Sequence, residues 1–203
     1  MTTKHRFISV AKRQFAENGF DRTSIASIAD ELGLTKQALL HHFGSKKNLY
    51  GEVLLRISER HTRIAADLVL ETEDPRVQLE TVLFASFENA MAEPLESQLL
   101  MRELLENSSR AETADTWYLK SSIEMLANIV LKLPAWKNAP RTEALTYVYQ
   151  LLGAINYFAI SQPTLKQMFG AQESEAMEKT FRAELYRLIQ AGVERIEMKE
   201  TQV

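Results

Sequence analysis

Apolar residues recur every three or four positions along nearly the whole chain, and this spacing constrains the fold more than any other feature. The first such segment places four side chains on one helical face: Phe7, Ile8, Ala11 and Phe15. No stretch alternates apolar and polar residues long enough to indicate a strand, and only seven glycines and five prolines interrupt 203 residues. The sequence therefore predicts an all-α protein with nine or ten helices and enough chain to bury a core without disulfides.

Capping residues and helix breakers predict where these helices begin and end. Asn18-Gly19 and Gly33 are stop signals, Asp74-Pro75 is a strong start, and Pro163 closes a strongly apolar helix. A loop is expected at 134–140 and a short helical turn at 164–169. The main helices are expected at about 3–18, 24–32, 35–42, 45–70, 75–92, 94–107, 112–133, 142–161 and 174–197.

Residues 23–43 read TSIASIADELGLTKQALLHHF and form the most informative segment. Two short helices flank the turn Leu32-Gly33-Leu34, and glycine tolerates the left-handed backbone that such a turn needs. Apolar side chains would lock the two helices together: Ile25, Ile28, Ala29, Leu32, Leu34 and Leu39. This pattern predicts a helix-turn-helix whose second helix can enter a DNA major groove.

The charge distribution agrees with a nucleic-acid partner for the N-terminal part. Residues 1–60 hold ten Lys or Arg and six Asp or Glu, whereas the whole chain has a net charge of −3. The remaining residues are therefore acidic, and an architectural DNA-binding protein, which would be basic throughout, fits less well.

Residues 7–50 resemble the N-terminal DNA-binding region of the TetR family of bacterial regulators, through "A…F…GF..TS...IA...G", "LTKQALLHHF" and "KKNLY". The resemblance implies a helix-turn-helix domain at 1–46, completed by the start of the helix at 45–70. It also implies a larger helical domain at 47–203 that binds a ligand and dimerises. A homodimeric, sequence-specific regulator is then expected, a ligand-released repressor on a palindromic operator in double-stranded DNA.

The residues expected to contact DNA lie at the starts of the two motif helices and along the second one. Gln37 stands where the family commonly has glycine, and its side chain can pair with adenine. Leu40 stands where tyrosine is usual and cannot hydrogen-bond a phosphate. His42 is expected to be structural. The predicted DNA contacts are Thr23, Ser24, Thr35, Lys36, Gln37, Leu40, His41 and Lys46, the last as a phosphate contact.

The helices at 142–161 and 174–197 are the expected dimer interface. Paired from two subunits, they would form a four-helix bundle. The alternative is that their apolar stripes only fill the core of one subunit. The predicted interface residues are Tyr149, Gly153, Ala154, Phe181, Leu185 and Leu188.

Aromatic and methionine side chains are frequent from residue 84 onward, which favours an apolar ligand pocket between helices. The alternative is that each of these residues is ordinary core. The expected effector is a small apolar or amphipathic molecule, with no metal or other cofactor. The predicted pocket residues are Phe84, Phe87, Met91, Met101, Arg102, Leu105, Trp117, Met125, Asn128, Tyr157 and Phe158.

An all-helical enzyme or a lipid-binding protein is the competing interpretation. The chain has no cysteine, no phosphate-binding glycine loop, no G-x-S-x-G and no H-E-x-x-H, and its four histidines all lie in or beside the N-terminal part. Only carboxylate chemistry, at Glu103 or Glu106, stays open. With neither a signal peptide nor an apolar stretch of about 20 residues, the expectation is a cytoplasmic protein without membrane contact and without enzymatic activity.

Overall fold

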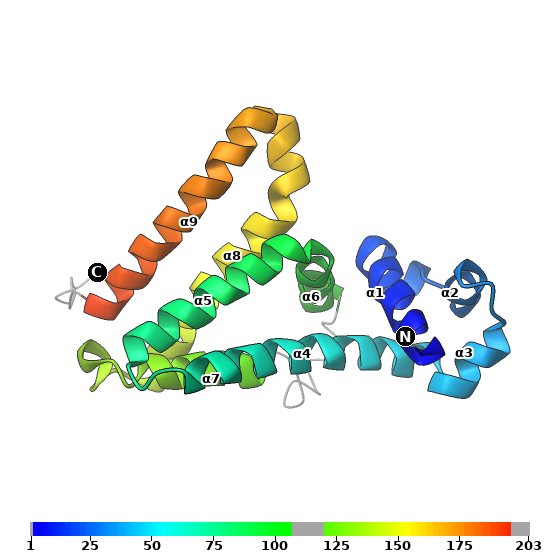
Figure 1. The fold of residues 1–203 in the computed structure, drawn as a ribbon, viewed down its shortest axis with the longest axis horizontal. Helices are drawn as coiled ribbons and strands as arrows, with labels where there is room; N and C mark the ends of the chain where they lie inside the picture. The colour runs from blue at the N-terminus through cyan, green and yellow to red at the C-terminus, as the bar shows by residue number, and fades with distance from the viewer. Residues whose placement is uncertain (1, 107–119, 196–203) are drawn as a thin grey trace. The chain divides into compact units, whose positions relative to one another are not determined.

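The computed structural model describes residues 2–106 and 120–195, and every regular element in these ranges is a helix (Figure 1). The predicted all-α fold is confirmed. The elements are α1 (Thr3–Arg22), α2 (Ile25–Glu31), α3 (Lys36–Phe43), α4 (Lys46–Leu70), α5 (Pro75–Ala92), α6 (Pro94–Glu106), α7 (Lys120–Val130), a 3-10 turn (Pro134–Trp136), α8 (Arg141–Phe169) and α9 (Ala171–Glu194).

The chain packs as two compact units. The first unit comprises Met1–Thr62 and Asn89–Lys120, and the second comprises Arg63–Glu88 and Ser121–Val203. Both α4 and α5 therefore contribute residues to each unit. This division by packing differs from the functional division after residue 46, which stays a prediction.

Local capping explains why the N-terminal helices begin and end where they do. The Thr35 hydroxyl accepts a hydrogen bond from the backbone N–H of Ala38, and Ser24 forms a capping box with Ser27. Gly19 has a positive φ of 81° and interrupts α1 where a stop was predicted, although one more helical turn follows to Arg22. Gly33, with φ 65°, makes the turn between α2 and α3.

The core of the first unit joins α1, α2, α3 and the start of α4, and α6 adds to it. The fully buried side chains include Phe7, Phe15 and Leu39, and Leu99 and Leu100 of α6 belong to the same cluster. Burying large side chains of this kind stabilises a fold by roughly 1.5–3 kcal/mol each. The helix α6, which lies 50 residues beyond the motif, is thus part of the unit that carries it.

In the second unit α8 and α9 form a helical hairpin held by aromatic side chains of its own (Figure 1). The Tyr147 hydroxyl donates to the carbonyls of Leu188 and Ile189 at 3.3 and 3.2 Å, and burial raises the pKa of Tyr147 to about 12. Trp136 Nε1 donates to the Gly192 carbonyl at 2.7 Å. A Cβ atom at Gly192 would lie 2.1 Å from the Tyr147 hydroxyl oxygen, so glycine is required there.

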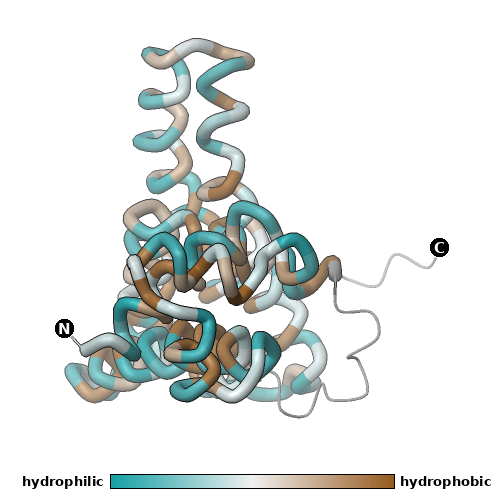
Figure 2. The backbone as a smooth tube through the Cα atoms, turned by 90° about the vertical axis from the view of Figure 1, so that its right-hand side faces the viewer, coloured by the Kyte–Doolittle hydropathy of each residue, from teal (hydrophilic) through white to brown (hydrophobic). Residues whose placement is uncertain are grey.

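The end of α8 corrects a sequence prediction. The expected stop at residue 161 is wrong, because α8 passes through Pro163 and ends at Phe169. Proline removes one backbone donor, but the turn before it gains side-chain donors: Ser161 Oγ bonds the Tyr157 carbonyl and Gln162 Nε2 bonds the Phe158 carbonyl. Hydrophobic and hydrophilic residues both occur on the two helices up to the hairpin tip, at the top of Figure 2.

Candidate nucleic-acid interface

The two helices of the motif are locked by their apolar faces, as the sequence predicted. Ile28 and Ala29 of α2 and Leu39 of α3 are fully buried, and Ile25, Leu32 and Leu34 pack against them. The backbone N–H of Leu34 donates to the Ala29 carbonyl at 3.0 Å, which closes the turn. This packing fixes α3 against α2 and leaves the other face of α3 without cover from the first unit.

That uncovered face carries polar side chains from one end of α3 to the other. Thr35, Lys36 and Gln37 are exposed at its start, and His41 is exposed at its end. Leu40 is half-buried, so it is held by the protein more than the polar residues are. Ser24 is exposed at the start of α2. Most of the predicted contact residues therefore share one accessible surface.

The ion pairs of the first unit show which cations remain available for phosphate. Lys4, Lys12, Arg13, Arg56 and Arg60 each have a carboxylate partner within 3.3 Å. Within residues 2–62 and 89–106, the exposed cations with no described carboxylate in ion-pair distance lie on or next to the motif: Arg6, Arg22, Lys36 and Lys47. Arg6 belongs here because its neighbour Phe7 contacts His42 and Phe43 of α3. Sequence reasoning missed Arg6 and Arg22, since pairing can be seen only in three dimensions.

Two predicted contact residues are placed differently from the expectation. Thr23 is only 2% exposed, and its hydroxyl donates to the carbonyls of Gln14 and Gly19. Lys46 Nζ donates to the carbonyls of Phe20 at 2.8 Å and Thr23 at 3.0 Å, and lies 4.3 Å from the centre of the Phe20 ring. Both side chains hold the connection between α1 and α2 and are not presented to a phosphate.

We expect Lys46→Ala and Lys47→Ala to act in different ways. Lys46→Ala removes the side-chain donor from the part-buried carbonyls of Phe20 and Thr23 and should lower the free energy of unfolding by about 1–3 kcal/mol. Lys47→Ala should leave stability unchanged and reduce the salt dependence of DNA binding by about one unit of slope, because one phosphate contact is lost. Urea unfolding and DNA titrations at several salt concentrations measure both. An unchanged slope for Lys47→Ala would contradict its assignment.

A buried carboxylate, Glu96, connects α6 to α1 and α4 within the first unit. Its Oε1 accepts from Lys12 at 3.0 Å, and its Oε2 accepts from Arg60 at 2.5 Å and faces His61 Nε2 at 3.2 Å. Burial alone would raise the pKa of Glu96, but hydrogen bonds from His61 and Lys12 and the charges of Lys12 and Arg60 outweigh it and lower the pKa to about 2. Glu96 therefore remains ionised at neutral pH.

Two further polar contacts fasten α6 to the motif. Arg102 donates to the carbonyls of Ala16 and Glu17 at 2.8 and 3.0 Å, just before the break in α1. The Tyr50 hydroxyl donates to Glu103 at 2.6 Å in a buried contact. Arg102 is therefore committed to the protein backbone, and Glu103 is bonded to a neighbouring tyrosine, which differs from the sequence-based suggestions of a ligand anchor and a catalytic carboxylate. The side chain of Glu106 lies outside the described residues.

The predicted pocket residues are not gathered at one site within either unit. Trp117 lies outside the described residues. Met91, Met101, Arg102 and Leu105 belong to the first unit, whereas Phe84, Phe87, Met125, Asn128, Tyr157 and Phe158 belong to the second. Asn128 accepts a hydrogen bond from Arg141 at 3.0 Å. Phe87 and Phe158 are buried in a stack with Phe181, so these rings fill space and leave none for a ligand.

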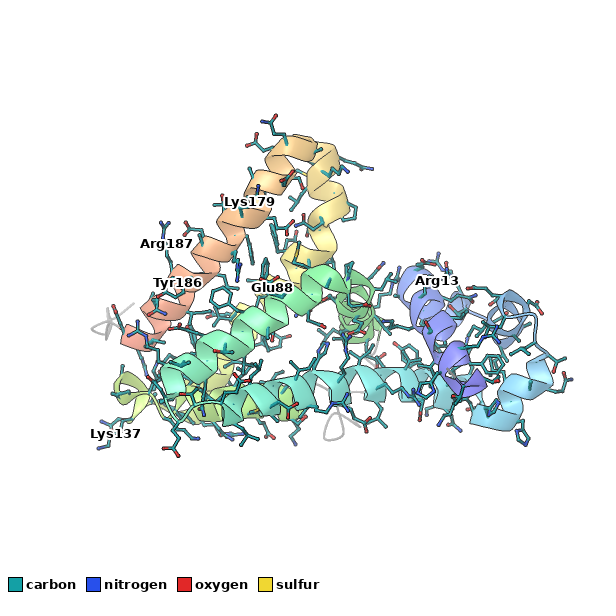
Figure 3. The ribbon with its side chains drawn as sticks, viewed as in Figure 1. Arg13, Glu88, Lys137, Lys179, Tyr186 and Arg187 are labelled. Carbon is teal, nitrogen blue, oxygen red and sulfur yellow. The ribbon has the colours of Figure 1, made fainter. Side chains whose placement is uncertain are left out.

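The second unit contains an open groove of about 470 Å³ between α5 and α9. It is lined by Phe84, Lys179, Arg182, Ala183, Tyr186 and Arg187. Tyr186 projects from α9 toward α5 (Figure 3), where its ring stacks on Phe84 at 6.3 Å between ring centres. Of the predicted pocket residues only Phe84 lines this groove, and the cations of its rim were not foreseen.

The exposed face of α8 carries a stripe of large side chains. Tyr149, Gly153 and Tyr157 are four residues apart and share one helical face, and the two tyrosines are 56% and 68% exposed. Leu188 of α9 is also exposed, and Ala154 is half-buried. Leu185 is 1% exposed and belongs to the core, so it is not available for the predicted interface, and Phe181 is half-buried with its ring stacked on Phe158. Tyr157 was assigned to the pocket, but it lies on this stripe.

Comparison with known proteins gives matches in sequence and in fold. Residues 7–53 match the bacterial regulatory proteins of the tetR family. The HTH-type transcriptional repressor KstR2 of Mycobacterium tuberculosis is 33% identical over 81 residues, which are 40% of this chain and 40% of KstR2. The fatty acid degradation regulator FadR from Bacillus halodurans superposes with a TM-score of 0.72 at 13% identity, covering 98% of this chain and 99% of FadR. FadR from Bacillus subtilis, solved in complex with stearoyl-CoA, also gives 0.72, at 14% identity, covering 95% of this chain and 99% of that protein.

The sequence match spans less than half of the curated relative, whereas the likeness in fold extends over nearly the whole chain. The sequence match covers the exposed helix-turn-helix face, and the fold likeness covers the helices that follow. No helix in the described ranges has the length and apolar content needed to cross a bilayer. Residues 7–53 are therefore similar to the tetR family of bacterial regulatory proteins, and the helices that follow share the fold of solved regulators.

Proposed function

We propose that this protein is a sequence-specific transcriptional regulator that binds an operator as a homodimer and is released from it by a small molecule. The observation that carries the DNA-binding part is the exposed polar face of α3, together with the exposed cations Arg6, Arg22, Lys36 and Lys47, which have no ion pair within the described residues. Phosphate contacts supply affinity, and polar side chains at the start of α3 supply base recognition.

Gln37→Ala is expected to change base preference at one position in each half-site. The side chain is exposed in the first turn of α3, where it can pair with a base edge, and such a pair gives about 1–3 kcal/mol of discrimination. Selection of binding sites from random DNA by the wild type and the variant measures this change. Lys36→Ala serves as a control, because losing a phosphate contact should weaken binding to all sequences alike. Identical motifs for wild type and Gln37→Ala would exclude base reading by Gln37.

The homodimer is supported by the exposed stripe on α8. Tyr149 and Tyr157 flank Gly153, which lets a second helix approach closely, and Leu188 extends the apolar surface onto α9. Aromatic side chains left in water on one helix face are typical of interface anchors. A two-fold axis through this stripe would pair α8 and α9 of one subunit with those of its partner.

The groove between α5 and α9 is the proposed effector site. Phe84, Ala183 and Tyr186 offer apolar contact, and the rim carries Lys179, Arg182 and Arg187. Each rim cation already has a carboxylate neighbour, Glu175, Glu88 and Glu184 respectively, so the rim is polar with little net charge. These contacts fit a small amphipathic molecule, with its apolar part on the aromatic rings.

An effector that releases the protein must bind the DNA-free state more tightly than the DNA-bound state. We expect operator DNA to weaken effector binding about 5–150-fold, the range of ordinary allosteric coupling. Calorimetric titration of a fluorescent fatty-acid analogue into the protein with and without operator measures the factor. Tyr186→Ala should abolish the binding of this probe, and equal affinity in both titrations would show that the groove does not control DNA binding.

A further inference from the structure

One imidazole nitrogen in the first unit lies beside both a hydrogen-bond donor and a hydrogen-bond acceptor. His61 Nε2 on α4 lies 3.0 Å from the side-chain nitrogen of Asn89 and 3.2 Å from Oε2 of Glu96. Asn89 lies in the last turn of α5, and Glu96 lies in the first turn of α6. The imidazole therefore stands between the two helices and touches both.

The orientation of the Asn89 amide follows from its other partner. Asn89 Oδ1 accepts a hydrogen bond from Arg60 Nη2 at 2.7 Å. A guanidinium can only donate, so the amide oxygen must face Arg60 and the amide nitrogen must face His61. The contact at 3.0 Å is then a hydrogen bond only if His61 Nε2 carries no proton and accepts.

Glu96 has the opposite requirement. A carboxylate can only accept, so the contact at 3.2 Å is a hydrogen bond only if His61 Nε2 carries a proton and donates. We propose that His61 is a proton-controlled switch, which accepts from Asn89 of α5 when it is neutral and donates to Glu96 of α6 when it is protonated. One nitrogen cannot accept from Asn89 and donate to Glu96 at the same time. Protonation of His61 therefore replaces its hydrogen bond to α5 with a hydrogen bond to α6.

The charged groups around the imidazole allow this exchange. Glu96 is held ionised by Lys12 and Arg60, so it can accept throughout the range from pH 5 to 8 in which histidine changes charge. Glu93 pairs with Lys12 at 2.9 Å at the edge of the same cluster. Lys12, Arg60, Glu93 and Glu96 together have no net charge, so a proton gained by His61 would give the cluster a net positive charge.

The position of the switch in the chain gives it a consequence for regulation. His61 lies one residue before α4 passes into the second unit at Thr62–Arg63, and Asn89 is the first residue after α5 returns from it at Glu88. The contact between them therefore joins the two points at which the chain crosses between units. Its loss on acidification removes one side-chain hydrogen bond between α4 and α5 and leaves the bond from Arg60 to Asn89, while α6 stays fastened to α1 through Glu96 and Arg102.

The switch itself can be tested without DNA, by nitrogen NMR of ¹⁵N-labelled protein between pH 8.5 and 5. We expect neutral His61 to carry its proton on Nδ1, and the side-chain amide of Asn89 to shift with the same midpoint as His61. In His61→Gln the Asn89 amide should not move in this range, whereas in the control His5→Gln it should move as in wild type. A neutral His61 with its proton on Nε2 would overturn the proposal. So would an Asn89 side-chain amide whose chemical shift does not change at the pH where the His61 signals change.

The regulatory consequence rests on the proposed function and has its own readout. The ratio of operator affinities of wild type and His61→Gln is compared at pH 8 and pH 6, which cancels every effect of pH that the two proteins share. We expect the ratio to change about fivefold or more between the two pH values. A constant ratio combined with the expected NMR result would show that His61 exchanges its hydrogen-bond partners without affecting the affinity for the operator. Absence of operator binding by either protein at both pH values would refute the proposed function and leave the NMR result standing.

Discussion

Glu96→Leu is expected to lower the free energy of unfolding by about 3–5 kcal/mol. Glu96 is 4% exposed and is the shared acceptor of Lys12 and Arg60. Leucine fits the space but leaves two cations facing each other without their common counter-charge, and uncompensated charge of this kind is strongly destabilising. Urea unfolding followed by circular dichroism measures the change.

Glu93→Gln is the matched control for this substitution. Glu93 bonds the same Lys12, but its side chain is 43% exposed, so losing its charge should cost less than about 1 kcal/mol. Comparable losses for both variants would show that burial of Glu96 is not what makes it important.

The pH dependence of stability gives an independent check on Glu96. Its pKa is lowered from 4.5 to about 2 on folding, so the unfolded chain binds the proton more tightly. The stability that the carboxylate contributes is therefore complete above about pH 4.5 and is lost as the pH falls toward 2. This shift corresponds to about 3 kcal/mol. Wild type and Glu96→Leu should accordingly differ most near neutral pH and converge in acid, and parallel curves from pH 6 to pH 2 would contradict the assignment.

Gly153→Glu is expected to convert the proposed homodimer into a folded monomer. Gly153 lies on the exposed stripe of α8, and a Cβ atom there would meet no other atom within 4 Å, so the variant subunit has no steric reason to misfold. In a two-fold interface each contact occurs twice, so two carboxylates would be buried opposite an apolar surface. A penalty of about 3 kcal/mol or more would raise the dissociation constant of the dimer at least about a hundredfold.

Sedimentation and operator titration measure the two consequences of this substitution. Loss of the dimer should abolish high-affinity binding to a two-half-site operator, because each subunit then binds only one half-site. Gly153→Ala is the matched control: it adds the same Cβ without charge, favours the helix, and should leave the dimer intact. A wild-type protein that sediments as a monomer at micromolar concentration, or a Gly153→Glu variant that remains dimeric, would place the interface elsewhere.

The features that the sequence alone determined are those fixed by local interactions. The caps at Ser24 and Thr35, the turn at Gly33 and the apolar faces of α2 and α3 depend on residues only a few positions apart. The helix-turn-helix and the exposure of Gln37 and His41 could therefore be predicted correctly. The helix stop predicted at Pro163 was wrong. A proline removes only one backbone donor, and the remaining hydrogen bonds and packing of α8 hold the helix together through Pro163.

Only the tertiary structure decided which partner each long polar side chain takes. Lys46 was predicted to contact phosphate, but it bonds carbonyls more than 20 residues away, and the phosphate role passes to Lys47 as a proposal. Glu96 and its partners Lys12 and Arg60 come from three helices, so no spacing in the sequence links them. Leu185, predicted at the dimer interface, lies in the core, and Tyr157, predicted in the ligand pocket, is exposed on α8. A flexible charged or aromatic side chain can meet many neighbours, and the one it meets is fixed by packing between helices distant in sequence.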